Sequence, residues 1–187
     1  VPAVNKALLL LLCAFASMRA VALDDALALR VQSLAAEASQ RAAPGLRVEV
    51  RIGRLDPRLK LAPCTQVQPY LPEGVRLWGA ARIGLRCTDA GVRWNVFLPL
   101  TVDVFGPGLV AAAPLPAGAT LAAADLKPAE VNLSAMPSAV LIDSTHAVGR
   151  TLARPLAAGE TLRSTDLRPR QWFAAGDSVR IVAGGSG

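Results

Sequence analysis

The feature that most constrains the fold is a fifteen-position pattern that occurs twice, at 114–128 and again at 155–169. The two copies agree at nine of the fifteen positions, without a gap, so that Pro114 corresponds to Pro155. The shared positions, as they stand in the first copy, are Pro114, Leu115, Ala117, Gly118, Thr120, Leu121, Asp125, Leu126 and Pro128. Shared Pro, Gly, Thr and Asp are not filler in an alanine-rich chain. The match therefore predicts two equivalent units that bury each other's apolar face.

Each copy contains the residues of a tight turn and of a polar cap. Proline and glycine favour a turn that leads into a short apolar segment, with the glycine at Gly118 in the first copy and Gly159 in the second. Asp125 and Asp166 are expected to accept backbone N–H groups at the start of a short helical turn. Two equivalent carboxylates could also act as an acid–base pair, but their identical local context favours the structural role.

Residues 1–22 have the pattern of a secretory signal peptide, which cleavage would remove from the folded protein. Lys6 supplies the positive start, residues 7–17 form an uncharged leucine-rich run, and Ala20-Val21-Ala22 is a small-x-small cleavage site. The apolar run is too short to cross a bilayer, and no later segment is long and apolar enough to do so. The sequence thus predicts an exported protein without stable membrane insertion.

Cleavage would remove Cys13 and leave Cys64 and Cys87, an even number of cysteines in an oxidising compartment. This pairing predicts a disulfide bond, which for a loop of this size contributes about 3 kcal/mol to stability. A metal pair and a catalytic thiol are the alternatives. Both lack support, because the single histidine, His146, is distant in sequence and no CxxC spacing occurs.

The formal net charge of +6 becomes +4 once Lys6 and Arg19 are removed. The basic residues are scattered through strand-like stretches, without the aromatic stacking series or the clustered charge that nucleic-acid binding requires. They are Arg47, Arg51, Arg54, Arg58, Arg82, Arg86 and Arg93. We interpret them as a solvated face with some preference for an acidic partner, and we predict no nucleic-acid binding.

The region from residue 23 to about 110 is predicted to begin with a helix. Apolar residues recur at helical spacing from Leu27 to Ala38. An aspartate at position 24 or 25 is placed to cap the N-terminus of this helix, and Pro44-Gly45 ends it.

Three strand patterns follow, at residues 46–52, 82–87 and 92–104, where apolar and polar residues alternate. Pro99 interrupts the longest of them. Because proline cannot donate a ladder hydrogen bond, we expect it at an edge, a bulge or a register change. Residues 23–110 are therefore predicted as one helix packed on an antiparallel sheet, in which the cysteines tie a loop to a strand.

Residues 111–187 contain the repeat and many Pro and Gly residues, so they are predicted as a second, nearly all-β domain. Within it, Ser178–Val182 alternates in the manner of a strand. Trp78, Trp94 and Trp172 are expected to be core anchors. The predicted fold class is α+β, mainly β.

No catalytic, cofactor-binding or metal site is predicted. The chain has no GxSxG nucleophile elbow, and its C-terminal Gly-rich segment lacks the lysine of a phosphate loop. His146 follows Asp143 in a loop, where a lone histidine is usually exposed to solvent or simply hydrogen-bonded. These observations point away from an enzyme.

The doubled pattern resembles the SAF domain, a compact β-clip fold. Upstream of it stand Cys64, Leu77-Trp78-Gly79 and Arg86-Cys87, followed by a long alternating strand. This order is similar to that of the flagellar basal-body P-ring formation protein (FlgA) family, over essentially the whole chain after the signal. Family members continue beyond the Gly-rich turn, so the resemblance implies that the second domain is C-terminally incomplete at Gly187. We therefore expect residues 170–187 to be loosely held.

The resemblance implies a periplasmic assembly chaperone. Such a protein binds the flagellar P-ring subunit and helps it to polymerise around the rod, without catalysis or a cofactor. Two alternatives stay open. One is a carbohydrate-binding module, which the absence of aromatic residues between 111 and 171 disfavours. The other is an adaptor of a pilus or secretion assembly system.

Overall fold

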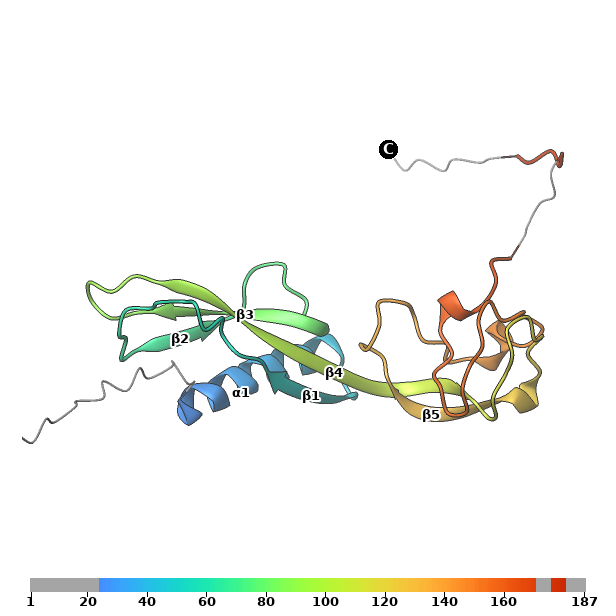
Figure 1. The fold of residues 1–187 in the computed structure, drawn as a ribbon, viewed down its shortest axis with the longest axis horizontal. Helices are drawn as coiled ribbons and strands as arrows, with labels where there is room; N and C mark the ends of the chain where they lie inside the picture. The colour runs from blue at the N-terminus through green and yellow to red at the C-terminus, as the bar shows by residue number, and fades with distance from the viewer. Residues whose placement is uncertain (1–23, 171–175, 181–187) are drawn as a thin grey trace, which may run out of the picture.

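The computed structural model describes residues 24–170 and 176–180, and the expected signal peptide at 1–22 lies outside them. The described chain has two lobes joined by one long strand (Figure 1). The strands are β1 (Arg47–Ile52), β2 (Val67–Tyr70), β3 (Gly79–Cys87), β4 (Asn95–Ala111) and β5 (Leu126–Asn132). With one α-helix, α1 (Asp25–Ala42), they confirm the mainly β, α+β fold class.

Helix α1 begins and ends where the sequence predicts. The Asp24 carboxylate accepts a hydrogen bond from the Ala26 N–H at 3.5 Å, which satisfies one of the free donors of the first turn. The helix ends at Ala42, shortly before Pro44. Its buried residues are Val31, Ala35 and Ser39, and the two apolar ones belong to the core of the sheet.

The first lobe is a sheet in the order β1-β4-β3-β2, antiparallel throughout, with α1 covering one face (Figure 1). Alternate residues of β4, from Leu98 to Val104, are buried in the same cluster as the helix. Trp78 and Trp94 are partly buried and pack against this cluster, whereas Trp172 lies outside the described residues. The buried members of the cluster are Val31, Ala35, Ala43, Leu77, Ile83, Leu85, Leu98, Leu100, Val102 and Val104.

Pro99 lies at a local edge of the sheet, without the bulge or register change that were the other expectations. It pairs with Arg82 in the middle of an unbroken β3–β4 ladder. The Gly53 N–H donates to the Pro99 carbonyl at 2.8 Å, so the proline nitrogen faces the same side, where β1 has already ended at Ile52. The missing N–H therefore costs the sheet no strand-to-strand bond.

Strand β4 belongs to both lobes. Phe105 pairs with Arg47 of β1 on one edge of β4 and with Asn132 of β5 on the other. From that point to Ala111, β5 continues along the edge that β3 occupies in the first lobe. The expected domain boundary near residue 110 falls at the end of this strand pairing.

The second lobe is built from the repeat, whose two copies are related by an approximate twofold axis. Leu115 and Leu156, equivalent residues of the two copies, bond to each other through reciprocal N–H···O bonds of 2.9 Å. The bridge between Val110 and Thr161 has its counterpart, at the offset of the repeat, in the bridge between Thr151 and Thr120. The copies together bury one apolar cluster: Leu109, Ala111, Leu121, Leu126, Ala147, Leu152, Leu156, Leu162 and Leu167.

The strand expected at Ser178–Val182 is not formed over its described part. Residues 177–180 have no regular secondary structure, and Val179 is 50% exposed. None of the described strands pairs with them, and an extended segment needs such a partner to become a strand. The last two positions, 181 and 182, lie outside the described residues.

Candidate functional site

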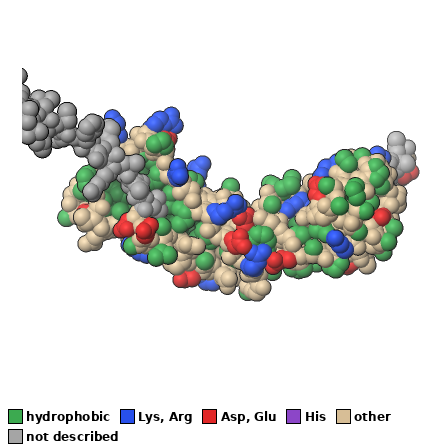
Figure 2. Space-filling view, turned by 60° about the horizontal axis from the view of Figure 1, so that its bottom comes forward, with side chains coloured by type: hydrophobic (Ala, Val, Ile, Leu, Met, Phe, Trp, Pro, Cys, Tyr) green, Lys and Arg blue, Asp and Glu red, His purple; other side chains and the backbone are tan. Residues whose placement is uncertain are grey.

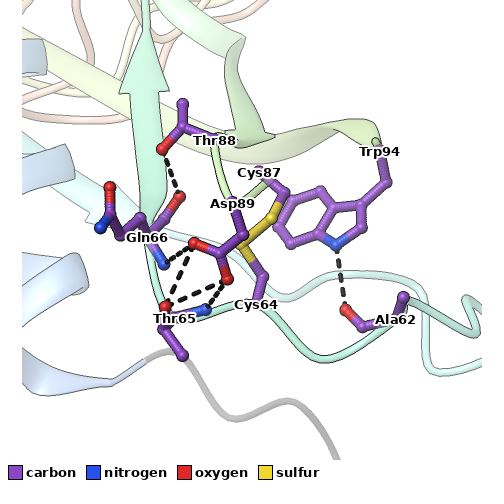
Figure 3. The surroundings of a disulfide bond; sticks show 8 residues. All are labelled: Ala62, Cys64, Thr65, Gln66, Cys87, Thr88, Asp89 and Trp94. Atoms are coloured by element: carbon purple, nitrogen blue, oxygen red, sulfur yellow. Dashed lines mark hydrogen bonds between the residues drawn. A yellow bond between two sulfur atoms is a disulfide. The ribbon is translucent and has the colours of Figure 1, made fainter. Parts of the chain in front are cut away.

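The predicted disulfide is present, and it ties the loop after β1 to the end of β3. The Cys64 and Cys87 sulfurs are bonded at 2.04 Å. Beside them, the Asp89 carboxylate accepts hydrogen bonds from the Thr65 N–H at 2.6 Å and the Gln66 N–H at 3.0 Å (Figure 3). These bonds hold the pKa of Asp89 below its usual value, and the bond from the Thr65 N–H has the largest effect.

The same end of the first lobe is braced by Trp94. Its indole N–H donates to the Ala62 carbonyl at 3.0 Å, in the loop that the disulfide holds (Figure 3). Cys64, Cys87 and Asp89 lie close enough to suggest a metal group. The two sulfurs are bonded to each other, however, so neither is the thiolate that a metal would need.

On the face of the first sheet that α1 does not cover, one tyrosine is held rigidly. Tyr70 pairs with Gly84 across β2 and β3, and its ring lies over that glycine so closely that a Cβ there would come within 2.2 Å of it. The Tyr70 hydroxyl lies 2.9 Å from Asn95 Oδ1, and the Arg86 guanidinium stands 5.4 Å from the ring centre. The Gln68 side chain accepts from Arg86 at 2.9 Å and holds that guanidinium in place.

Next to Tyr70, the long strand β4 exposes a large apolar side chain. Phe97 pairs with Gly84 and is 52% exposed. One step along the sheet, Pro99 and Arg82 pair and are both exposed. A shallow depression of about 530 Å³ follows, lined in part by Arg51, Arg82 and Pro99. We call this surface the open face and define it by six residues: Arg51, Tyr70, Arg82, Arg86, Phe97 and Pro99.

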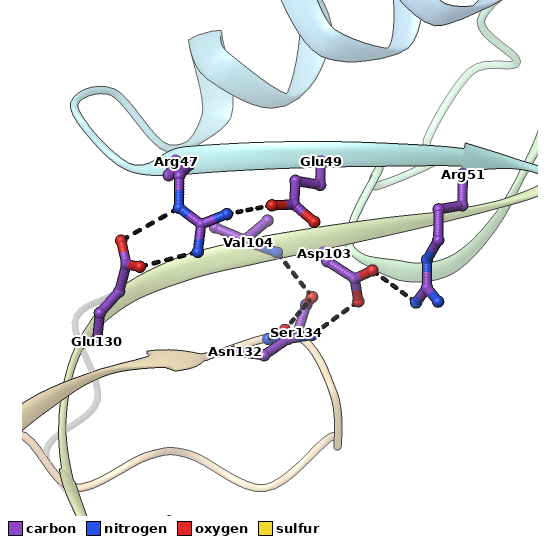
Figure 4. Close-up of polar contacts among 8 residues, drawn as sticks. All are labelled: Arg47, Glu49, Arg51, Asp103, Val104, Glu130, Asn132 and Ser134. Carbon is purple, nitrogen blue, oxygen red and sulfur yellow. Dashed lines mark hydrogen bonds and ion pairs between the residues drawn. The ribbon is translucent and has the colours of Figure 1, made fainter.

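The junction between the lobes is fixed by polar side chains around Asp103, which is only 6% exposed (Figure 4). Its carboxylate accepts from Asn132 Nδ2 at 2.7 Å and pairs with Arg51 at 2.6 Å. Ser134 fills the gap between β3 and β5 on the edge of β4. Its hydroxyl accepts from the Val104 N–H at 3.0 Å and donates to the Val102 carbonyl at 2.8 Å. The backbone groups left free between the two partner strands are thereby satisfied.

A second set of charges spans the junction further along β4, on the same face of the sheet as Asp103. Arg47 pairs with Glu130 of β5 at 2.8 Å, contacts Glu49, and stands 3.8 Å from the centre of the Phe105 ring. The hydrogen bonds from Arg47 lower the pKa of Glu130. Figure 2 shows basic and acidic side chains gathered at this narrow waist between the two lobes.

The repeated aspartates both accept a backbone hydrogen bond within a short helical turn. Each is the last residue of a one-turn 3₁₀ helix and reaches back to the residue before that turn. Asp125 accepts from the Ala122 N–H at 2.8 Å, and Asp166 from the Arg163 N–H at 2.7 Å. Each aspartate thus accepts a backbone N–H at the start of a short helical turn, as the sequence predicts, from the last position of that turn.

The two aspartates differ in their surroundings. Asp166 is 3% exposed and also accepts from Arg154 Nε at 2.7 Å, whereas no basic side chain bonds to Asp125 within the described residues. Arg154 joins Asp166 to Glu160. The pKa of Glu160 is lowered mainly by the hydrogen bond from the Ala157 N–H and next by the bond from Arg154.

The buried guanidinium of Arg163 has a different role. It donates to the backbone carbonyls of Asn132, Ser138 and, more weakly, Met136 at 2.8, 2.7 and 3.3 Å. It therefore fastens the loop after β5 to the second copy of the repeat. In the first copy, Ala122 stands at the position of Arg163, so this attachment is made only once.

The remaining predicted positions lie in turns. Gly118 and Gly159 have positive φ angles of 82° and 77°, the conformation that favours glycine. His146 is exposed and ends a 3₁₀ turn in which Asp143 caps the Thr145 N–H. Within the described residues, no hydrogen bond or ion pair joins His146 to either repeated aspartate.

None of the helices in the described ranges is long and apolar enough to cross a membrane.

The open face was not predicted, although the sequence carried a signal for it. Alternation along 92–104 puts Phe97 on the side of Asn95 and Thr101, which are polar, and opposite the apolar series. An aromatic residue on the polar side of a long strand exposes apolar area, and next to further exposed apolar groups it forms a patch of the kind found at binding surfaces.

Comparison with known proteins assigns both lobes. Residues 29–104 match the family model of the FlgA N-terminal domain, and residues 106–187 match that of the chaperone for flagella basal body P-ring formation. Among curated protein sequences nothing matches the chain.

Three solved structures are similar to the chain. Salmonella FlgA in its open form is 26% identical, with a TM-score of 0.47 over 84% of this chain and 72% of that one. Its closed form is 26% identical, with a TM-score of 0.44 over 74% of this chain and 68% of that one. FlgA from Thermotoga maritima is 13% identical, with a TM-score of 0.42 over 79% of this chain and 55% of that one. The two family models match adjoining ranges that meet within β4. The chain therefore belongs to the FlgA family of chaperones for P-ring formation in the flagellar basal body.

Proposed function

We propose that this protein acts in the periplasm, where it binds the P-ring subunit and promotes its polymerisation around the flagellar rod. The observation that carries the proposal is the pair of family matches, which together run from residue 29 to residue 187. The disulfide between Cys64 and Cys87 supports it, because such bonds persist in oxidising compartments such as the periplasm.

The described contacts fit a protein that works by binding. Buried polar side chains at the junction and in the repeat are engaged with each other or with backbone, for example those of Asp103, Asp166 and Arg163. The open face, in contrast, presents aromatic and arginine side chains to solvent. In this proposal the protein holds the subunit without forming or breaking a covalent bond.

Purified oxidised protein and purified P-ring subunit test the role directly. We expect a complex in sedimentation velocity, and faster, more complete ring formation by the subunit in electron micrographs. In a strain from which the gene is deleted, the intact gene should restore P-rings, and a copy lacking residues 1–22 should not. Absence of any complex with a correctly folded subunit would contradict the proposal.

A further inference from the structure

The open face is an unpartnered surface on the first lobe. Helix α1 packs on the opposite face of the sheet (Figure 1). Between Asn95 and Thr101, alternate residues of β4 point away from α1. Their partners on β1 and β3 include three charged residues: Arg51, Arg82 and Arg86. Along this part of β4, the charges that the paired positions present are therefore all positive.

Part of the open face is rigid before any partner arrives. Tyr70 rests on Gly84, is fixed through its hydroxyl by Asn95, and lies beside the Arg86 guanidinium. Aromatic and arginine side chains that are already ordered lose little conformational freedom on binding, so they contribute strongly to interfaces. The contacts of Tyr70 add nothing to the hydrophobic core, since its ring lies on the side of the sheet away from α1.

The other part of the open face offers apolar area next to free positive charge. Phe97 is 52% exposed on the longest strand of the sheet, where large aromatic side chains are usually covered by a neighbour. Arg82 stands beside it and forms no ion pair with the described residues. Arg51, although paired with the buried Asp103, keeps 70% of its side chain exposed. An occupant that complements these groups carries carboxylates around an apolar side chain.

We propose that the open face is the docking surface for an acidic segment of the P-ring subunit, with an apolar side chain of that segment packed on Phe97 and Tyr70. The proposal rests on the proposed chaperone function and adds to it the surface and the chemistry of recognition. Arg82 and Arg86 receive the carboxylates, and the depression beside Pro99 admits the neighbouring side chain.

The test compares single changes on the open face with matched changes on the exposed side of α1. Arg82→Glu and Phe97→Ser alter the open face, while Arg30→Glu and Leu29→Ser introduce the same new side chains on the helix, where both residues are exposed. Affinity for purified P-ring subunit is measured by calorimetry with the full oxidised protein. We expect each open-face change to weaken binding about tenfold or more, and each helix change to leave it within about twofold.

Further arms separate the possible results. Arg82→Gln, which removes the charge without reversing it, should weaken binding less than Arg82→Glu and reduce its dependence on salt. Unfolding curves of all variants confirm that the changes leave the fold intact. If wild type binds the subunit and the open-face variants bind it equally well, the docking surface is elsewhere and the proposed function survives. If wild type binds no subunit, the proposed function itself fails.

A membrane surface is the competing occupant of a positive face. Wild-type protein should not sediment with vesicles of phosphatidylglycerol and phosphatidylcholine at physiological salt. Vesicle binding that Arg82→Glu abolishes, together with unchanged subunit binding in the same variant, would overturn the proposal in favour of a lipid-facing role.

Discussion

The two lobes share one strand but are stabilised in different ways. The first is a helix-backed sheet with continuous ladders, closed at its far end by a disulfide between Cys64 and Cys87. The second has no described helix longer than one turn. The β4–β5 ladder and isolated bridges hold it together, and one of these bridges joins Leu115 to Leu156, equivalent residues of the two copies. Its cohesion is reciprocal, since each copy supplies partner groups that the other needs.

The lobes also differ in which side chains they leave exposed to solvent. In the repeat, the duplicated residues are engaged within the fold: Leu115 pairs with Leu156, and the aspartates bond to backbone. The first lobe covers one face of its sheet with α1 and leaves the open face to solvent. A conspicuous sequence pattern can thus mark structure, while the surface that we propose for docking is marked by a single aromatic residue that departs from the alternation.

The largest expected effect separates the lobes by their covalent bond. Replacing both cysteines, as Cys64→Ser with Cys87→Ser, should lower the free energy of unfolding by about 3 kcal/mol, because the unfolded chain regains the freedom of the closed loop. Hydrogen exchange should show the loss in amides of β2 and β3, with the repeat unaffected. The reductant-treated wild type is the control and should match the variant. Equal loosening of both lobes would show that they unfold as one unit.

Asp166→Ala should produce the converse pattern. The change removes the acceptor for the buried Arg163 N–H and for Arg154, so we expect a loss of about 2 kcal/mol. Faster exchange should be confined to residues 109–167. Asp166→Asn retains an acceptor for the backbone and should recover part of the loss. A variant as stable as wild type would show that Asp166 does not stabilise the second lobe.

Asp125→Ala tests the difference between the two copies. The Asp125 side chain accepts one bond, from the Ala122 N–H, in a place that solvent reaches, so we expect a loss of about 1 kcal/mol. Urea denaturation of both aspartate variants in one buffer measures the ratio of their losses in unfolding free energy. A loss for Asp125→Ala equal to that of Asp166→Ala would mean that burial and Arg154 add nothing. Either variant, while folded, should bind the P-ring subunit as wild type does.

The smallest effect is a dependence on acid. The hydrogen bonds from Thr65 and Gln66 lower the pKa of Asp89 below its reference value of 3.8, so the charged carboxylate favours the folded state. This stabilisation is present above pH 3.8 and is lost as the pH falls through the lower, folded-state pKa. In Asp89→Asn, the stability of the first lobe should depend less steeply on pH between about 4 and 2. An unchanged slope would show that other carboxylates govern acid unfolding.

Much of the fold could be predicted because its signals are local. The spacing from Leu27 to Ala38 predicted α1, and the constant offset between the two copies anticipated the pairing of the repeats. The even cysteine count predicted the disulfide. These features depend on periodicity, composition and compartment, which a sequence displays directly.

The parts that were missed depend on distant contacts. Strand β2 is short and contains Pro69, so nothing local distinguishes it from a loop; it forms because β3 pairs with it. Burial of Asp166 and not of Asp125 results from Arg154 and Arg163, whose positions only the folded repeat defines. The role of Ser134 at the junction is likewise invisible until β3 and β5 meet on one edge of β4.

Binding of the P-ring subunit by this protein can be tested in one titration. The exported, oxidised protein is titrated with purified P-ring subunit while complex formation is followed by calorimetry. We expect a saturable complex that Asp125→Ala preserves and Arg82→Glu weakens. A folded, oxidised protein that shows no heat of binding and no complex with a folded subunit would contradict it.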